Sequence, residues 1–230
     1  MKILALDTAT EIGGVALLEG EVLRGQVQIL VNKTHASQLW KSIFFLLEEA
    51  GWTIEDIELW AVTIGPGSFT GLRIGLATIK GLGLATGKPV IGLSTLEVLA
   101  RSFPYFPQLI CPTIDARKKE VFCAFYRSNP QGKVEQVREP RNIKPPILTG
   151  EIKEPVLLVG TGALLYADFF REKLGPLALV PEAHLHTLSP QAVGLLALER
   201  YQKGYRPSLE EIRPLYIRPS DAELGRRVNT

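Results

Sequence analysis

Two short loops carry the residue types that phosphate chemistry uses. The first is Asp7-Thr8-Ala9-Thr10, which follows an apolar run expected to form a strand over residues 2–7. A carboxylate at that position can hold a hydrated magnesium ion, and the threonine hydroxyls can contact a phosphate. Loops of this kind normally have glycine where Ala9 stands, because the phosphate needs bare backbone. A turn stabilised by an Asx-type hydrogen bond is the alternative interpretation.

The second loop runs from Gly65 to Gly71 and leads directly into an apolar helix. Its glycines allow close backbone approach, and the start of a helix presents unpaired N–H groups to an anion. The loop is not a Walker motif, because Leu72 rather than lysine follows Gly71. A strand-to-helix turn capped by Ser68 or Thr70 is the other interpretation. The contacts predicted for a weakly bound ATP or ADP are Asp7, Thr8, Thr10, Gly65, Gly67 and Ser68.

The other reactive side chains lack the partners that catalysis or metal binding needs. His35 has no histidine or carboxylate three or four residues away, and the pair His184 and His186, expected on one side of a strand, has no third ligand. Cys111 and Cys123 form no C-x-x-C pair and are expected to be small core residues. No G-x-S-x-G motif marks a serine nucleophile. We therefore predict no catalytic residue, no metal site and no required cofactor.

One basic cluster stands out against a nearly balanced charge. Arg117, Lys118 and Lys119 lie between Asp115 and Glu120, where they form either a solvated turn or a contact with a partner. With 26 Lys+Arg against 24 Asp+Glu, the net charge is only +2. If the protein binds a nucleic acid, its overall charge is therefore not the main source of affinity. Arg117, Lys118 and the tail arginines are the candidates for an RNA contact.

Length and composition describe an ordinary globular protein. The 230 residues are 46% hydrophobic and 22% charged, which suits one large domain or two small lobes and excludes intrinsic disorder. The first apolar run stops at Asp7, too early for a secretory signal, and no uninterrupted apolar stretch is long enough to span a membrane. We expect a cytoplasmic protein that has no membrane contact.

The order of expected elements indicates an α/β fold with a mixed sheet. A meander of three strands precedes alternating strands and helices, and a change in composition near residue 103 suggests a lobe boundary. We assign residues 1–102 to an N-terminal lobe, with a helix at 190–203 as a candidate to complete it, and residues 103–230 to a second lobe with a C-terminal tail. Strands are expected at 2–7, 13–18, 22–30, 59–64, 90–93, 109–114, 121–127 and 156–160, helices at 34–50, 70–86, 95–102 and 163–174, and an irregular surface crossing at 129–154.

Two of these helices have unusual surfaces. The helix at 34–50 has an apolar stripe wider than the roughly 100° that a surface helix needs. The helix at 70–86 places Gly71, Gly75 and Gly83 in one row, and glycine costs a helix about 1 kcal/mol per residue against alanine, which implies a very close neighbour. That neighbour is either the chain's own sheet or a second chain, in which case the two helices supply half of a four-helix packing.

Several stretches, taken together, match one known family. They are Gly13-Gly14-Val15-Ala16, the run GPGSFTGLRIG at residues 65–75, Asp115-Ala116-Arg117 with Glu120-Val121-Phe122, and Pro214-Leu215-Tyr216-Ile217-Arg218. On these residues the chain resembles the TsaB (YeaZ) family. The resemblance implies an actin-like (ASKHA, ribonuclease-H-like) ATPase fold of two lobes with mixed sheets. It also implies a role in making threonylcarbamoyladenosine beside the tRNA anticodon.

The resemblance further implies that this subunit is a non-catalytic scaffold. In the family it binds and stabilises a homologous catalytic subunit, TsaD, the small ATPase TsaE joins them, and tRNA is met through the complex. A homodimer is expected when the chain is alone. The catalytic relative has an H-x-x-x-H metal pair where Thr95 and Leu99 stand here. The rival interpretation is an ATP-dependent small-molecule kinase or ATPase of the same fold.

In the family, the partner seam is formed by the first two helices of each subunit. Those helices correspond to residues 34–50 and 70–86 of this chain. From helical spacing, the residues expected at the seam are Trp40, Phe44, Leu47, Leu72, Gly75, Leu76, Ile79 and Gly83.

Overall fold

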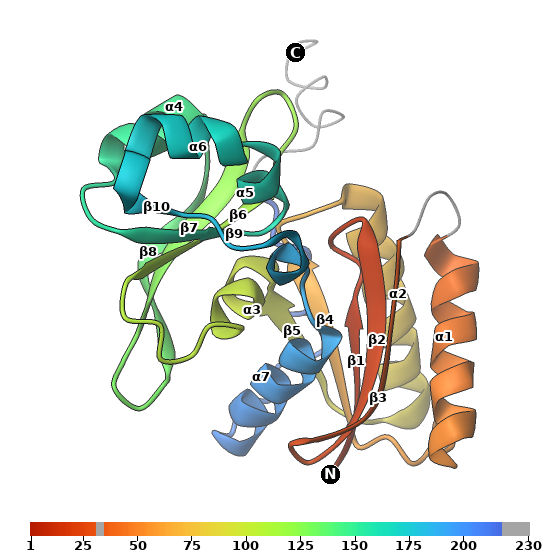
Figure 1. Cartoon of the computed structure of the whole chain (residues 1–230). Coiled ribbons are helices and arrows are strands. Elements are labelled where there is room, and N and C mark those ends of the chain that lie inside the picture. Colours follow the sequence, from red (N-terminus) through yellow and green to blue (C-terminus); the bar gives the residue numbers. More distant parts are fainter. Residues whose placement is uncertain (31–34, 218–230) are drawn as a thin grey trace.

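The computed structural model describes residues 1–30 and 35–217, and it contains two five-stranded sheets with helices on their faces (Figure 1). In the first sheet, an antiparallel meander is followed by two strands that run parallel to its first strand. The strand order is β3-β2-β1-β4-β5, with β1 Lys2–Asp7, β2 Ile12–Glu19, β3 Val22–Leu30, β4 Leu59–Gly65 and β5 Val90–Ser94.

The second sheet repeats the topology of the first, although the sequence shows no internal repeat. A meander again comes first, and two parallel strands again extend the sheet from the meander's first strand. The order is β10-β9-β6-β7-β8, with β6 Leu109–Asp115, β7 Val121–Ser128, β8 Val134–Ile143, β9 Val156–Val159 and β10 Ala178–Leu179.

The prediction of an irregular surface crossing at residues 129–154 is wrong. Strand β8 and a short helix, α4 (Pro145–Glu151), occupy most of it. β8 is the edge strand of its sheet, and five consecutive residues near its start are exposed. An exposed edge lacks the apolar alternation by which a strand is found in a sequence.

Helices cover both faces of the first sheet. On one face lie α1 (His35–Ala50) and α2 (Phe69–Thr86), and on the other lie α3 (Thr95–Arg101) and α7 (Pro190–Gln202) (Figure 1). Two core clusters correspond to these faces, and a third belongs to the second sheet. Within the described ranges, no helix is both long and apolar enough to cross a membrane.

The later helices depart from the sequence expectation in two places. The helix expected at 163–174 is split at Tyr166 into α5 (Thr161–Leu165) and α6 (Ala167–Leu174). Residues Ala183–His186 form a 3₁₀ turn instead of a strand, so the two histidines do not share a side. His184 is exposed, whereas His186 is buried with its ring nitrogens 3.1 Å from the Gly160 amide nitrogen and 3.0 Å from the Pro181 oxygen.

The C-terminal part of the chain returns to the first sheet. Helix α7 contacts β1 and β2, and Leu209 and Ile212 pack with the core beneath α1 and α2. The Leu215 amide then donates a 2.7 Å hydrogen bond to the Ile64 carbonyl of β4. This path brings the last described residues, up to Ile217, beside the loop that follows β4.

Side chains from β3 hold the start of α7. The Gln26 side-chain oxygen accepts from the Gln191 amide at 2.9 Å and from the Ser189 hydroxyl at 3.2 Å, which satisfies donors at the helix N-terminus. Further along α7, Gly194 lies so close to the sheet that an added Cβ would be 2.5 Å from a Leu18 methyl carbon. The helix is therefore fitted to the sheet both by polar contacts and by shape.

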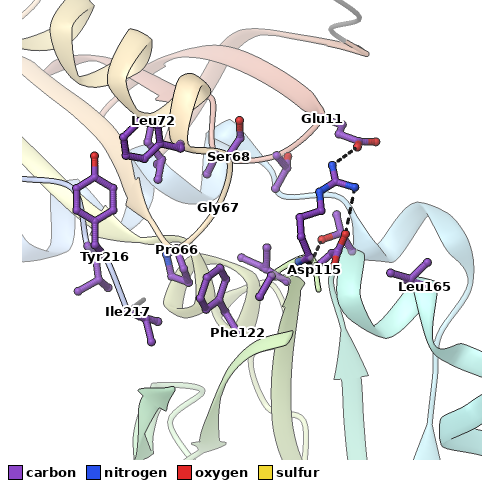
Figure 2. Close-up of a pocket in the computed structure, with 18 of the residues that line it drawn as sticks. Glu11, Pro66, Gly67, Ser68, Leu72, Asp115, Phe122, Leu165, Tyr216 and Ile217 are labelled. Atoms are coloured by element: carbon purple, nitrogen blue, oxygen red, sulfur yellow. Dashed lines mark hydrogen bonds and ion pairs between the residues drawn. The ribbon is translucent and has the colours of Figure 1, made fainter. Parts of the chain in front are cut away.

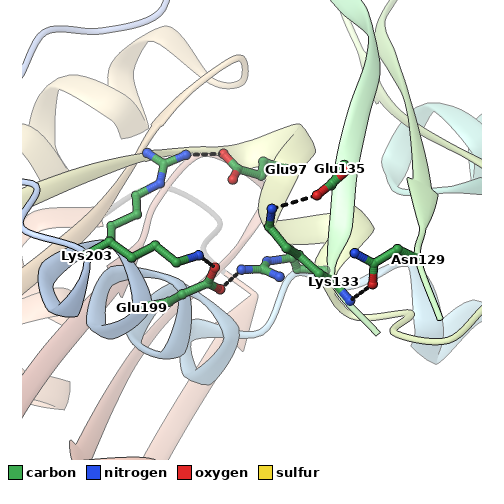
Figure 3. A network of polar contacts seen from close by, with 8 residues as sticks. Glu97, Asn129, Lys133, Glu135, Glu199 and Lys203 are labelled. Atoms are coloured by element: carbon green, nitrogen blue, oxygen red, sulfur yellow. Dashed lines mark hydrogen bonds and ion pairs between the residues drawn. The ribbon is translucent and has the colours of Figure 1, made fainter. Parts of the chain in front are cut away.

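Charged side chains join α7 to α3, the helix next to the second lobe (Figure 3). Arg200 pairs with Glu97, Arg101 pairs with Glu199, and Lys203 also pairs with Glu199. The first two pairs are partly shielded from water, so they are screened less than ordinary surface pairs. Helix α3 packs on β6 and β7 as well, which ties the two lobes together.

A substitution at Gly194 tests the fit of α7. Gly194→Leu should lower the free energy of unfolding by about 1–3 kcal/mol, because the leucine would displace Leu18 in a packed core. Gly150→Leu in α4 is the matched control, since an added Cβ there meets open space, and it should be neutral or stabilising by up to about 1 kcal/mol because leucine favours a helix more than glycine does. Urea unfolding measures both, and equal stabilities for the two variants would contradict this packing.

Candidate functional site at the cleft between the lobes

A cleft of about 880 Å³ lies where the two lobes meet (Figure 2). Five segments form it: the β1–β2 loop, the start of α2, the β6–β7 turn, α5 and the C-terminal segment. Its size suits a ligand or a short stretch of polymer. Side chains that form its walls and rim include Glu11, Phe69, Leu72, Asp115, Arg117, Phe122, Leu164, Leu165, Leu215 and Tyr216.

Asp7 does not reach this cleft. It is fully buried, and its Oδ1 accepts from the Thr63 hydroxyl at 2.6 Å and from the Ala9 amide at 3.0 Å, while Oδ2 accepts from the Thr10 hydroxyl at 3.3 Å. Burial raises the pKa of this carboxyl, and the hydrogen bonds oppose that effect only in part. The bond from Ala9 makes the Asx-type turn, so Asp7 holds its own loop in shape.

The glycine row of α2 packs against that same loop. A Cβ at Gly71 would lie 2.0 Å from the Thr8 carbonyl oxygen, and one at Gly75 would lie 2.2 Å from Thr8 Oγ1. Further along, a Cβ at Gly83 would lie 2.4 Å from a methyl carbon of Val90. The close neighbours that the glycines require are thus within the chain: the β1–β2 loop for Gly71 and Gly75, and strand β5 for Gly83.

The loop before α2 closes over the first loop as well. A Cβ at Gly67 would lie 2.3 Å from the Ala9 carbonyl oxygen, which accepts a 2.7 Å hydrogen bond from the Ser68 amide. The Ser68 hydroxyl accepts from the Gly71 amide at 3.2 Å and so caps α2. Because these donors are used internally, the helix start has fewer N–H groups to offer an anion.

The residues predicted for nucleotide contact therefore divide into two groups. Thr10, Gly67 and Ser68 line the cleft. The other three do not: Asp7 and Thr8 are buried and line a separate, small cavity, and Gly65 faces Leu215. Thr8 Oγ1 has no hydrogen-bond partner among the described residues. The structure does not bring the six side by side around one phosphate position.

The cleft has an aromatic wall and a charged rim that the sequence alone did not predict. Phe69 and Tyr216 stack with ring centroids 5.5 Å apart, and the Arg73 guanidinium lies 3.8 Å from the Phe69 centroid. On the rim, Arg117 lies 3.3 Å from Glu11 and 3.4 Å from Asp115 (Figure 2). Both aromatic residues belong to the family motifs, but nothing in the sequence indicates that the tail reaches α2.

The two residues compared above with a metal pair face the protein interior. Thr95 and Leu99 are buried, and Leu99 belongs to the core cluster that extends between the two sheets. Within residues 1–30 and 35–217, no three His, Cys, Asp or Glu residues lie close enough together to hold a metal ion. Cys111 and Cys123 are fully buried, as expected for core residues.

Most of the residues expected at a partner seam lie inside the chain. The exceptions are Phe44, whose side chain is 54% exposed, and Trp40, which is half-buried and stacks on Phe44 with centroids 5.7 Å apart. The others cannot face a partner, because they pack against this chain's own strands and helices. They are Leu47, Leu72, Gly75, Leu76, Ile79 and Gly83.

The outward surface of the same two helices nevertheless carries several exposed apolar residues, among charged ones such as Lys41, Glu48 and Arg73. We call it the α1–α2 face and define it by Phe44, Phe45, Ala77, Gly81 and Leu84, all of which are exposed. Leu84 is 76% exposed, and a Cβ at Gly81 would meet nothing within 4 Å. Exposed apolar residues on neighbouring helices make this face a candidate for a site that another molecule covers.

The repeated sheets and the cleft between them define an α/β protein of the two-lobed, actin-like ATPase fold. The activator of the 2-hydroxyisocaproyl-CoA dehydratase from Clostridium difficile, solved with bound ADPNP, has this fold at a TM-score of 0.51. It is 12% identical, with 90% of this chain and 99% of that chain covered, so the likeness concerns the fold alone. A family model for tRNA N6-adenosine threonylcarbamoyltransferase matches residues 24–226.

More similar proteins narrow the assignment. The tRNA threonylcarbamoyladenosine biosynthesis protein TsaB of Escherichia coli is 31% identical over 225 residues, or 95% of each chain, and that of Bacillus subtilis is 29% identical over 226 residues, or 97% and 96%. The solved YeaZ from Pseudomonas aeruginosa is 26% identical with a TM-score of 0.77, covering 94% of this chain and 99% of that one. The chain belongs to the TsaB (YeaZ) family.

Substitutions of Asp7 separate a structural role from a magnesium-binding one. Asp7→Ala should cost about 2 kcal/mol or more of stability, because it leaves the Thr63 hydroxyl and the Ala9 amide without their buried acceptor. Asp7→Asn keeps an acceptor for both and removes a buried charge, so at neutral pH it should be as stable as the wild type or more so. Urea unfolding distinguishes the two variants.

The pH dependence of stability gives a second measure of Asp7. Since the folded-state pKa is raised above 3.8, the contribution of this carboxyl is complete below that pH and is lost as the pH rises through the folded-state pKa. Asp7→Asn should remove this loss and leave a flatter profile than the wild type has. If the pH profile of stability were the same in Asp7→Asn and in the wild type, the carboxyl of Asp7 would not have a raised pKa in the folded protein.

Proposed function

We propose that this chain takes part in tRNA threonylcarbamoyladenosine biosynthesis as a non-catalytic scaffold. It binds and stabilises the catalytic homologue TsaD, which transfers the threonylcarbamoyl group to adenosine. The family relationship supports the pathway, and the exposed α1–α2 face supports the scaffold role. TsaE and tRNA are reached through the complex, and in the absence of TsaD two copies pair through the same face.

The α1–α2 face suits a helix-to-helix contact. Ala77 and Gly81 are one helical turn apart on α2 and have almost no side chain, so a partner helix can approach the backbone closely. Phe44, Phe45 and Leu84 supply apolar area around that contact. The proposed partner surface therefore lies on the two predicted helices, but it consists of the outward residues of the α1–α2 face.

The alternative, an ATP-dependent kinase or ATPase, is less well supported by the geometry. Such an enzyme needs a carboxylate that faces its nucleotide, but Asp7 is buried, and its Oδ1 already accepts from the Thr63 hydroxyl and the Ala9 amide. The Ser68 amide and hydroxyl are engaged within the chain as well. Magnesium-dependent ATP turnover by the purified chain that is abolished by Asp7→Asn, with the fold intact, would favour the alternative.

Two substitutions on the α1–α2 face test the scaffold role. Gly81→Leu and Phe44→Glu should each raise the dissociation constant for TsaD at least about tenfold, or ~1.4 kcal/mol, because one blocks close helix approach and the other places a charge in an apolar contact. Neither should destabilise the fold, since both positions are open to solvent. Calorimetric titration measures the affinity.

Val137→Glu is the control for these variants. Val137 is an exposed apolar residue on β8, in the other lobe, and its substitution should leave the affinity for TsaD unchanged. Gly75→Leu should instead impair folding, because the added side chain would overlap Thr8. If both α1–α2 variants bound TsaD as the wild type does, or if TsaD alone modified tRNA as fast as the mixture, the scaffold proposal would be wrong.

A further inference from the structure

The turn between β6 and β7 holds three cationic residues in a strained backbone conformation. Arg117, Lys118 and Lys119 have φ values of 59°, 53° and 60°, in the left-handed region. The turn is closed by hydrogen bonds between Ala116 and Glu120 and from the Glu120 amide to the Arg117 carbonyl, both 3.0 Å. Glycine or asparagine would adopt this conformation at lower cost. Long cationic side chains are therefore placed here against the local backbone preference.

This turn lies on the rim of the cleft. Arg117 lines the cleft, whereas Lys118 and Lys119 follow it on the same turn, exposed but outside the cleft lining. Arg117 forms ion pairs with Asp115 and Glu11, and in the second of these pairs both side chains are exposed, by 75% and 74%. An exposed pair of this kind exchanges readily with another anion.

Across the cleft stands the aromatic wall. Phe69 and Tyr216 are 38% and 40% exposed, and their stack is extended by Arg73. Exposed aromatic rings next to cationic groups are the means by which proteins hold unpaired nucleotides, since bases stack on rings while phosphates meet the cations. The two halves of such a site face the same cleft (Figure 2).

We propose that this cleft binds an unpaired stretch of tRNA, with phosphates on the β6–β7 turn and a base against Tyr216, the outer ring of the stack with Phe69 and Arg73. The inference rests on the proposed function, because the family modifies an adenosine in a single-stranded loop. It deepens that function by giving the scaffold its own contact with the substrate RNA. A free nucleotide is a poorer fit, since the Ser68 amide and Asp7, which would meet its phosphates and metal, are already engaged.

Charge variants of the rim test the proposal. A fluorescent anticodon stem-loop RNA is titrated with the full-length chain, alone and in complex with TsaD, at several salt concentrations. Lys118→Gln/Lys119→Gln should weaken RNA binding about tenfold and reduce the slope of log affinity against log salt by about 1.4. Glu11→Gln should act in the opposite direction and strengthen binding, because it removes the anion that competes for Arg117.

The control removes two equal charges elsewhere. Lys88, beyond the far end of α2, and Lys153, before β9, are exposed and distant from the cleft, so Lys88→Gln/Lys153→Gln should leave the affinity unchanged. Tyr216→Ala should also weaken binding, with little effect on the salt slope. The rim variants should bind TsaD normally, so loss of RNA affinity alone separates this inference from the scaffold proposal.

Equal RNA affinities for the rim variant and the control would overturn the inference. So would saturable binding of free ATP in the cleft by a chain that does not bind the RNA. The effect of the α1–α2 variants on TsaD binding tests only the scaffold proposal. The RNA affinities of the rim variants test the RNA inference independently.

Discussion

The close contact between the start of α2 and the β1–β2 loop determines the rest of this structure. Gly67, Gly71 and Gly75 let the helix and its preceding loop lie directly on Ala9 and Thr8, where any Cβ would overlap backbone or a hydroxyl. The Ser68 amide completes the contact by donating to the Ala9 carbonyl. Two loops that resemble phosphate-binding loops thereby contact each other, and the Ser68 amide is engaged within the chain.

This contact separates the inside of the molecule from its two working surfaces. With Asp7 buried and α2 fixed to the sheet, the outward residues of α1 and α2 form an apolar face on one side. On another side lies the cleft, with its aromatic wall and cationic turn. These two surfaces are the ones that the proposed scaffold role and the proposed RNA contact would use.

Most of the helices and strands could be predicted from the sequence, because apolar patterns and flanking glycines mark them locally. The buried strands and the glycine-flanked helices were found within a few residues, and the family motifs indicated the fold. The neighbour of the glycine row could not be predicted, since Gly71, Gly75 and Gly83 suit a close approach to this chain's own residues or to a second chain equally well. Exposed strand β8 lacks apolar alternation, and the pairing of Tyr216 with Phe69 joins residues far apart in the chain.

Hydrogen exchange at the Ser68 amide tests the central contact most directly. If this N–H donates to the Ala9 carbonyl in the folded chain, its exchange is slow, and adding ATP with magnesium leaves it slow in both the free chain and the complex with TsaD. Fast exchange without nucleotide, followed by protection of residues 66–71 and 7–10 when ATP is added, would mean that the loops open to bind phosphate. That result would contradict the closure of the two loops on each other.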